Sequence, residues 1–163
     1  MPMKKKLAAA AMALAVIVSS GGLSYAAASH SHGGDATAIT RMTLDNGRKW
    51  QTDQPLRDGM NGIRDTLDLS LPLIHGGSYG PDEFSALAES VQSYIDYIAV
   101  NCKLPEEADA QLHLALEQMF EGIDALKGDT AQEQGILAIV AALNAYGEHF
   151  DHPGWMPMAV DAH

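Results

Sequence analysis

The amino-acid sequence predicts an all-α fold, an antiparallel up-down-up-down four-helix bundle that follows a cleaved signal peptide and an N-terminal strap. Residues 54–152 contain four segments in which apolar residues recur at helical spacing, so each segment can bury one face. Short connections separate these segments, and short connections favour antiparallel neighbours. No segment alternates apolar and polar residues with comparable strength, as a half-buried strand would.

Residues 1–28 are predicted to be a secretory signal peptide. Three lysines precede an apolar run, Leu7 to Val18, that is too short to span a bilayer, and small residues follow at candidate cleavage positions. We therefore expect a periplasmic product of one domain. Removal of this segment, which holds three lysines and no acidic residue, changes the formal charge from −11 to −14. Such a protein is expected to repel nucleic acids and anionic membrane surfaces.

Residues 29–53 are expected to form a flexible lead followed by a strap. The Asn46-Gly47 pair is a turn signal between short apolar pieces, which predicts either a small hairpin or an extended segment. Trp50 is expected to pack this strap on the helices.

The first helix is expected from about Gln54 to Leu67, capped by Thr52 or Asp53. Its predicted apolar face is Leu56, Met60, Ile63 and Leu67. A connector is expected over residues 71–80, because Pro72 and a Gly-Gly pair interrupt regular structure. The second helix is expected to begin at Pro81, and its apolar stripe is Phe84, Leu87, Val91, Ile95, Ile98 and Cys102.

The third helix is expected to follow the reversal at Pro105 and to end at Gly128. Thr130 and Glu133 have the spacing of a capping box for the fourth helix. That helix presents Ile136, Ile139, Val140, Leu143, Tyr146 and Phe150 on one face. Residues 153–163 are expected to form a C-terminal tail.

A metal site is predicted from the side chains that this topology brings together. In such a bundle the starts of the first and third helices meet the ends of the second and fourth, so Met60, Cys102, His113 and His152 should converge. Thiolate, thioether and imidazole form a soft ligand set that suits copper. The predicted function is periplasmic copper binding, delivery or sensing, with a redox or metal-handling protein as a candidate partner. In the alternative interpretation these side chains fill the core or lie at its edge.

The sequence favours no enzymatic activity and no catalytic residue. It lacks the nucleophile motif Gly-x-Ser-x-Gly, a phosphate-binding Gly loop and the zinc motif HExxH. It also lacks Cys-x-x-Cys-His, the attachment motif of c-type haem.

Three stretches of the chain resemble small exported bacterial proteins labelled DnrO. They are residues 44–60, which include Asn46-Gly47-Arg48-Lys49-Trp50, residues 101–113, and Phe150-Asp151-His152-Pro153-Gly154-Trp155. The resemblance covers nearly the whole mature chain. It implies an exported helical protein, and the label suggests a genetic context near nitrogen-oxide respiration genes rather than a chemistry.

Residues 56–67 are similar to the first helix of the soluble periplasmic b-type four-helix cytochrome, which implies haem b as an alternative cofactor. Met60 matches the methionine ligand of that family, whereas Gly147 stands where its histidine is expected and His149 comes two residues later. A haem carrier would require Met60 and His149 to face each other across a cavity. A third alternative is a metal-free, partner-binding bundle with an exposed apolar patch, in which the same end is filled by Leu56, Ile98, Leu112 and Tyr146.

Overall fold

The computed structural model describes residues 37–159, and this part of the chain confirms the all-α prediction. It contains four α-helices: α1 (Gln54–His75), α2 (Pro81–Asn101), α3 (Glu106–Lys127) and α4 (Gln132–His149). A short 3-10 helix, η1 (Ala38–Arg41), precedes them, and two strands of two residues each, β1 (Trp50–Gln51) and β2 (Phe150–Asp151), flank them. The predicted signal peptide lies outside the described residues.

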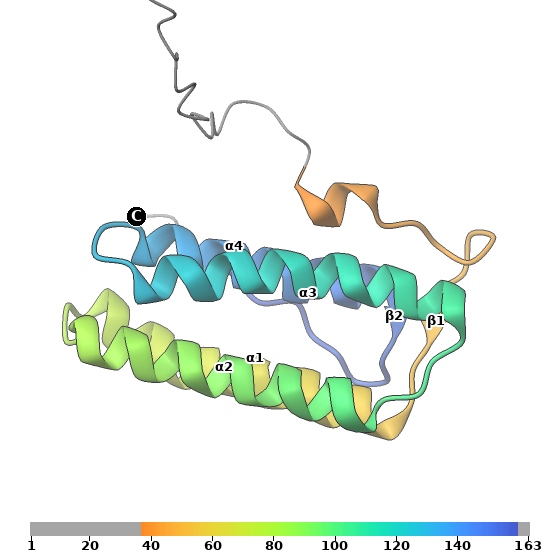
Figure 1. The fold of residues 1–163 in the computed structure, drawn as a ribbon, viewed down its shortest axis with the longest axis horizontal. Coiled ribbons are helices and arrows are strands. Elements are labelled where there is room, and N and C mark those ends of the chain that lie inside the picture. The colour runs from red at the N-terminus through yellow and green to blue at the C-terminus, as the bar shows by residue number, and fades with distance from the viewer. Residues whose placement is uncertain (1–36, 160–163) are drawn as a thin grey trace, which may run out of the picture. The chain divides into compact units, whose positions relative to one another are not determined.

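Each helix packs against the next one along the chain, α1 on α2, α2 on α3 and α3 on α4. Figure 1 shows α2 and α3 in front, with α1 and α4 behind them. The core consists of apolar faces of all four helices, and its largest fully buried side chains include Leu56, Met60, Ile63, Leu67, Ile95, Ile98, Met119, Ile123, Leu126, Ile139, Tyr146 and Phe150. No helix within residues 37–159 is long and apolar enough to cross a membrane.

Helix α1 begins as the sequence predicts but ends later. The side chain of Asp53 accepts a hydrogen bond from the backbone N–H of Leu56, which caps the helix. The expected end near Leu67 is wrong, because α1 continues through Pro72 to His75. Ser70 is buried there and its hydroxyl accepts a hydrogen bond from Tyr79 (2.9 Å), so tertiary contacts hold the last turns of the helix.

The start of helix α4 differs from the predicted capping box. Ala131 occupies the N-cap position and no side chain caps the helix. Instead, α4 approaches α3 so closely that a Cβ atom on Gly135 would lie 2.7 Å from the carbonyl oxygen of Gly122. Backbone contact, rather than a cap, positions this end of α4.

The strap folds back on the helices through a turn and a strand pair. Asn46 and Gly47 have positive φ angles inside an antiparallel bridge between Asp45 and Arg48, which is a hairpin-like turn. The indole of Trp50 packs against the core and donates to the carbonyl of Thr43 (2.7 Å). Strands β1 and β2 then pair in parallel, with Trp50 opposite Phe150 and Gln51 opposite Asp151.

The C-terminal segment contacts both α1 and α4. Trp155 lies against α4 at Gly147, where a Cβ atom would come within 2.3 Å of its Nε1 atom. The guanidinium of Arg64, from α1, lies 5.8 Å from the centre of the Trp155 ring. The side-chain amide of Asn144 exchanges two hydrogen bonds with the backbone of Met158. Trp155 therefore contacts one residue of each helix, Arg64 of α1 and Gly147 of α4.

Candidate functional site

The carboxylate of Asp53 joins the start of α1 to the end of α2. It accepts hydrogen bonds from the backbone N–H groups of Leu56 (2.9 Å) and Lys103 (2.6 Å) and from the thiol of Cys102. Burial acts to raise the pKa of Asp53, but these hydrogen bonds and the charge of Arg57 outweigh it, so the pKa is lowered. Asp53 is therefore ionised at neutral pH and fixes the surroundings of the only cysteine.

Cys102 is half-buried at the C-terminal end of α2. Burial raises the pKa of its thiol to about 12, with further contributions from the charge of Asp53, its hydrogen bond and the charge of Asp109. The thiol is therefore protonated at neutral pH and is a weak nucleophile. A metal ion would have to displace its proton.

An aromatic cluster lies at the end of α4, within the electrostatic influence of Asp53 and Arg57. The Tyr146 ring stacks on Phe150 (5.1 Å between centroids) and meets Trp155 edge-on (5.0 Å). Its hydroxyl is 2.9 Å from Nδ1 of His152, whose ring lies 4.9 Å from that of Trp155. Burial raises the pKa of Tyr146 well above its usual value. Burial and the charges of two arginines lower the pKa of His152, so its imidazole is neutral and its Nδ1 atom can accept a hydrogen bond from the hydroxyl group of Tyr146.

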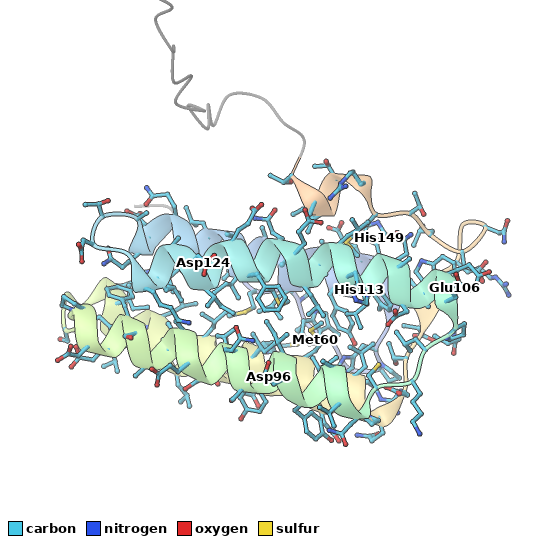
Figure 2. All side chains as sticks on the ribbon, in the orientation of Figure 1. Met60, Asp96, Glu106, His113, Asp124 and His149 are labelled. Atoms are coloured by element: carbon cyan, nitrogen blue, oxygen red, sulfur yellow. The ribbon has the colours of Figure 1, made fainter. Side chains whose placement is uncertain are left out.

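The four predicted metal ligands do not form one site in the described residues. Cys102 and His113 line a common pocket of about 240 Å³, together with Asp109 and the apolar residues Ile98, Ala99, Leu112 and Leu116. His152 is instead held in the aromatic cluster, and Met60 is fully buried in the core, between the helices in Figure 2. Within residues 37–159, no group of three or more His, Cys, Asp and Glu side chains is placed to hold a metal ion.

His113 is tied to its own helix. Its Nδ1 atom lies 2.9 Å from the carbonyl oxygen of Asp109, and its side chain is 70% exposed. Because Nδ1 is engaged in this way, Nε2 is the atom available to a ligand.

The two residues of the haem hypothesis, Met60 and His149, have the following surroundings. Met60 has no exposed surface, and Nδ1 of His149 is 2.8 Å from the carbonyl oxygen of Ala145 in its own helix. Gly147, at the position of the expected histidine, is covered by the Trp155 ring. The indole of Trp155 therefore lies against α4 at this position.

A groove that the sequence did not predict lies between α2 and α3. It measures about 550 Å³, and it is lined by Ile95, Asp96, Ala99, His113, Leu116, Glu117, Phe120, Glu121 and Asp124. The labelled side chains of Asp96, His113 and Asp124 mark this front face in Figure 2. Phe120 is 41% exposed although it is a large apolar residue. In the sequence, Phe120 directly follows Met119, which is fully buried, so Phe120 lies off the buried face of α3.

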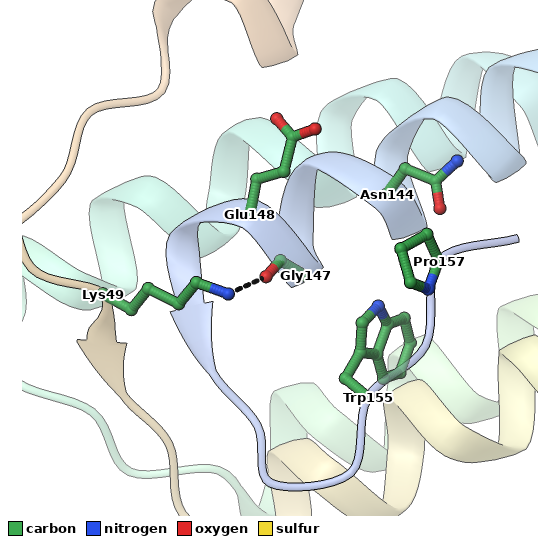
Figure 3. A pocket seen from close by; sticks show the side chains of 6 residues that line it. All are labelled: Lys49, Asn144, Gly147, Glu148, Trp155 and Pro157. Atoms are coloured by element: carbon green, nitrogen blue, oxygen red, sulfur yellow. Dashed lines mark hydrogen bonds between the residues drawn. The ribbon is translucent and has the colours of Figure 1, made fainter.

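A smaller hollow of about 320 Å³ lies where the strap and the C-terminal segment meet α4 (Figure 3). It is lined by Lys49, Asn144, Gly147, Glu148, Trp155 and Pro157. The ammonium group of Lys49 donates to the carbonyl oxygen of Gly147 (2.6 Å), and Asn144 is bonded to Met158. Lys49 and Asn144 thus already serve to hold the strap and the tail.

Comparison of the chain with protein-family models, with curated proteins and with solved structures found no match.

Proposed function

We propose that this chain is an exported, partner-binding four-helix protein whose docking site is the groove between α2 and α3, hereafter the α2–α3 groove. The observation that carries the proposal is the partly exposed Phe120 in a groove with an apolar floor. Water in contact with such a floor would be released when a partner covers it, which favours binding. An unpaired apolar groove on a folded domain is typical of interaction sites.

The packing of four apolar side chains near the predicted metal ligands supports the same proposal. Leu56, Ile98, Leu112 and Tyr146 are all at most 2% exposed, which is the packing expected of a metal-free bundle. These side chains belong to the core, whereas the α2–α3 groove is open to solvent.

The proposal also includes the topology of the bundle and the location of the protein. The packing of consecutive helices supports an antiparallel up-down-up-down bundle. The basic and apolar segment at residues 1–28 supports a signal peptide and a periplasmic location.

Selection of displayed peptides, followed by amide chemical-shift mapping on the signal-less protein, tests the docking site. We expect selected peptides to shift amides of α2 and α3 and to lose binding to Phe120→Asp. Leu69→Asp is the matched control, because Leu69 is an exposed leucine of α1 outside the groove. Shifts confined to other helices, or equal binding by Phe120→Asp, would refute the proposal.

A second candidate function, Cu(I) binding, is favoured by one observation, the shared pocket of Cys102 and His113. A thiolate and the Nε2 atom of an imidazole are ligands that copper accepts, and the apolar walls would limit access of water. Met60 and His152 are not lining residues of this pocket, so this candidate relies on two protein ligands.

An anaerobic Cu(I) titration against a chromophoric competitor tests this second function. We expect one equivalent to bind, and Cys102→Ser and His113→Ala to weaken binding at least about tenfold, while the control His149→Ala does not. Asp53→Asn should strengthen binding, because it removes the charge that helps to keep the thiol protonated. Unchanged binding in Cys102→Ser would rule the pocket out.

A further inference from the structure

The chemistry of the α2–α3 groove identifies the kind of partner that would fit it, and this inference rests on the proposed function. Apolar side chains form its floor, namely Ile95, Ala99, Leu116 and Phe120. Four carboxylates line it as well, Asp96 from α2 and Glu117, Glu121 and Asp124 from α3. Neither lysine nor arginine is among the lining residues. The groove therefore offers an apolar surface between negative charges.

Most of these charges lack a cation within the described residues. Asp96 accepts a hydrogen bond from Gln92, and Glu121 accepts one from Gln118 (3.3 Å). Glu117 pairs with Arg41 of η1 at 2.8 Å, but both side chains are 55% exposed. An ion pair so open to water contributes at most about 1 kcal/mol, so an incoming cation can replace it.

The length and walls of the groove favour a helical partner. The α3 residues that line it run from His113 to Asp124, which corresponds to about 16 Å at 1.5 Å per residue. A helix of about three turns matches that length and presents apolar side chains at i, i+3 or i+4, and i+7 to one groove. A helix also satisfies its own backbone hydrogen bonds, whereas an extended peptide would find only side chains here and no strand edge to pair with.

We infer that the α2–α3 groove binds a basic amphipathic helix of about three turns from a partner protein. Its apolar face would lie on Leu116 and Phe120, and its lysine or arginine side chains would reach Asp96, Glu121 and Asp124. Positive charge on the partner would also speed its encounter with a chain of formal charge −11.

Three synthetic peptides test the inference against the signal-less protein. They share leucines at i, i+3, i+4 and i+7 and carry Lys, Gln or Glu at the remaining positions. Fluorescence anisotropy should rank binding as Lys above Gln above Glu. The advantage of the Lys peptide should shrink as salt is raised from about 20 mM to 300 mM, because salt screens exposed charges. Phe120→Asp should abolish the binding of all three.

A charge reversal gives the sharper test. The double variant Glu121→Lys, Asp124→Lys should weaken the Lys peptide at least about tenfold and strengthen the Glu peptide. Asp65→Lys, Asp129→Lys is the matched control, since it makes the same change in net charge at exposed positions outside the groove. The control should leave the order of binding unchanged. Circular dichroism of both variants establishes that they remain folded.

The possible failures separate the inference from the proposed function. If the Glu peptide binds in the groove as tightly as the Lys peptide or more tightly, the inference of a basic partner is wrong, but the groove remains a docking site. If no peptide binds and display selects none, both proposals fail. Self-association that disappears in Phe120→Asp would assign the groove to a second copy of this chain and overturn the basic helix.

Discussion

At the scale of single residues, Gly147 shows how one missing side chain decides what occupies the gap beside α4. The Nε1 and Cδ1 atoms of Trp155 lie where a Cβ atom on residue 147 would be, at 2.3 and 2.4 Å. The indole can therefore lie directly on the helix backbone, in reach of Tyr146 and of the Arg64 guanidinium. The absence of a side chain at residue 147 is thus what allows Trp155 to pack on α4.

We predict that Gly147→Ala destabilises the protein by about 1–3 kcal/mol, the usual cost of overpacking, in spite of the higher helix propensity of alanine. In a Trp155→Ala background the same substitution should instead stabilise by about 0.5–1 kcal/mol, because the obstacle is gone. Urea unfolding of the four proteins in this double-mutant cycle measures both values. A stabilising effect of Gly147→Ala in the wild type would show that Trp155 does not lie on α4.

The individual site residues were predictable in part. Cys102 could be placed at the end of α2 and beside the start of α3, since a short reversal follows it. His113 shares a pocket with it, whereas Met60 and His152, which were expected at the same place, are not among the lining residues. The position of His152 could not be derived, because it depends on the path of an irregular tail that is set by contacts with Tyr146 and Trp155.

At the scale of whole elements, α1 is the clearest case in which packing keeps a helix regular in spite of a proline in its interior. Pro72 lacks an N–H group, so the carbonyl of Asp68 loses its usual helical partner, yet the helix continues to His75. Leu71 and Ile74 pack against the core on either side of the proline. Their burial compensates for the missing hydrogen bond.

Pro72→Ala should therefore stabilise the protein by about 1–3 kcal/mol, since it restores the backbone hydrogen bond and removes the ring from the turn. Thermal or urea unfolding gives the difference. Leu73→Ala is a suitable neighbour for comparison, because Leu73 is exposed and its truncation should change stability by less than about 0.5 kcal/mol. No gain from Pro72→Ala would contradict a regular helix at this position.

Helix faces were predictable from sequence, whereas some boundaries and both strands were not. The face Leu56, Met60, Ile63 and Leu67 is buried as its spacing predicts, because helical period and burial are local properties. Strands β1 and β2 have two residues each and pair across about one hundred positions of sequence. A segment of that length carries no periodicity, so only the folded arrangement of the helices reveals the pair.

At the scale of the whole molecule, the protonation state of His152 makes the free energy of unfolding depend on pH. Burial and the charges of Arg57 and Arg64 lower its pKa from 6.5 in the folded chain, with a smaller opposing effect of Asp58. Between the folded pKa and 6.5 the unfolded chain binds more protons than the folded chain. The stability that a neutral His152 contributes is therefore complete above about pH 7 and decreases as the pH falls through that window.

We expect the free energy of unfolding to decrease between pH 7.5 and pH 5, and His152→Gln to reduce that decrease. Urea titrations at several pH values measure the slope. His113→Gln serves as the comparison, because His113 is mostly exposed and outside the aromatic cluster. The lowered pKa of Asp53 affects stability only at more acidic pH, below about 4, so the two effects separate. An unchanged slope in His152→Gln would contradict this account.

The parallel pairing of Trp50 with Phe150 also bears on the order in which the chain folds. Contacts between consecutive helices close short loops, whereas this pair closes a loop of about one hundred residues, at a greater loss of chain entropy. Hairpins of helices should therefore form first and the strand pair last. Weakening the pair would then accelerate unfolding while leaving the refolding rate nearly unchanged. The contact between the two ends of the domain would thus determine how long the folded state persists, but not how fast it forms.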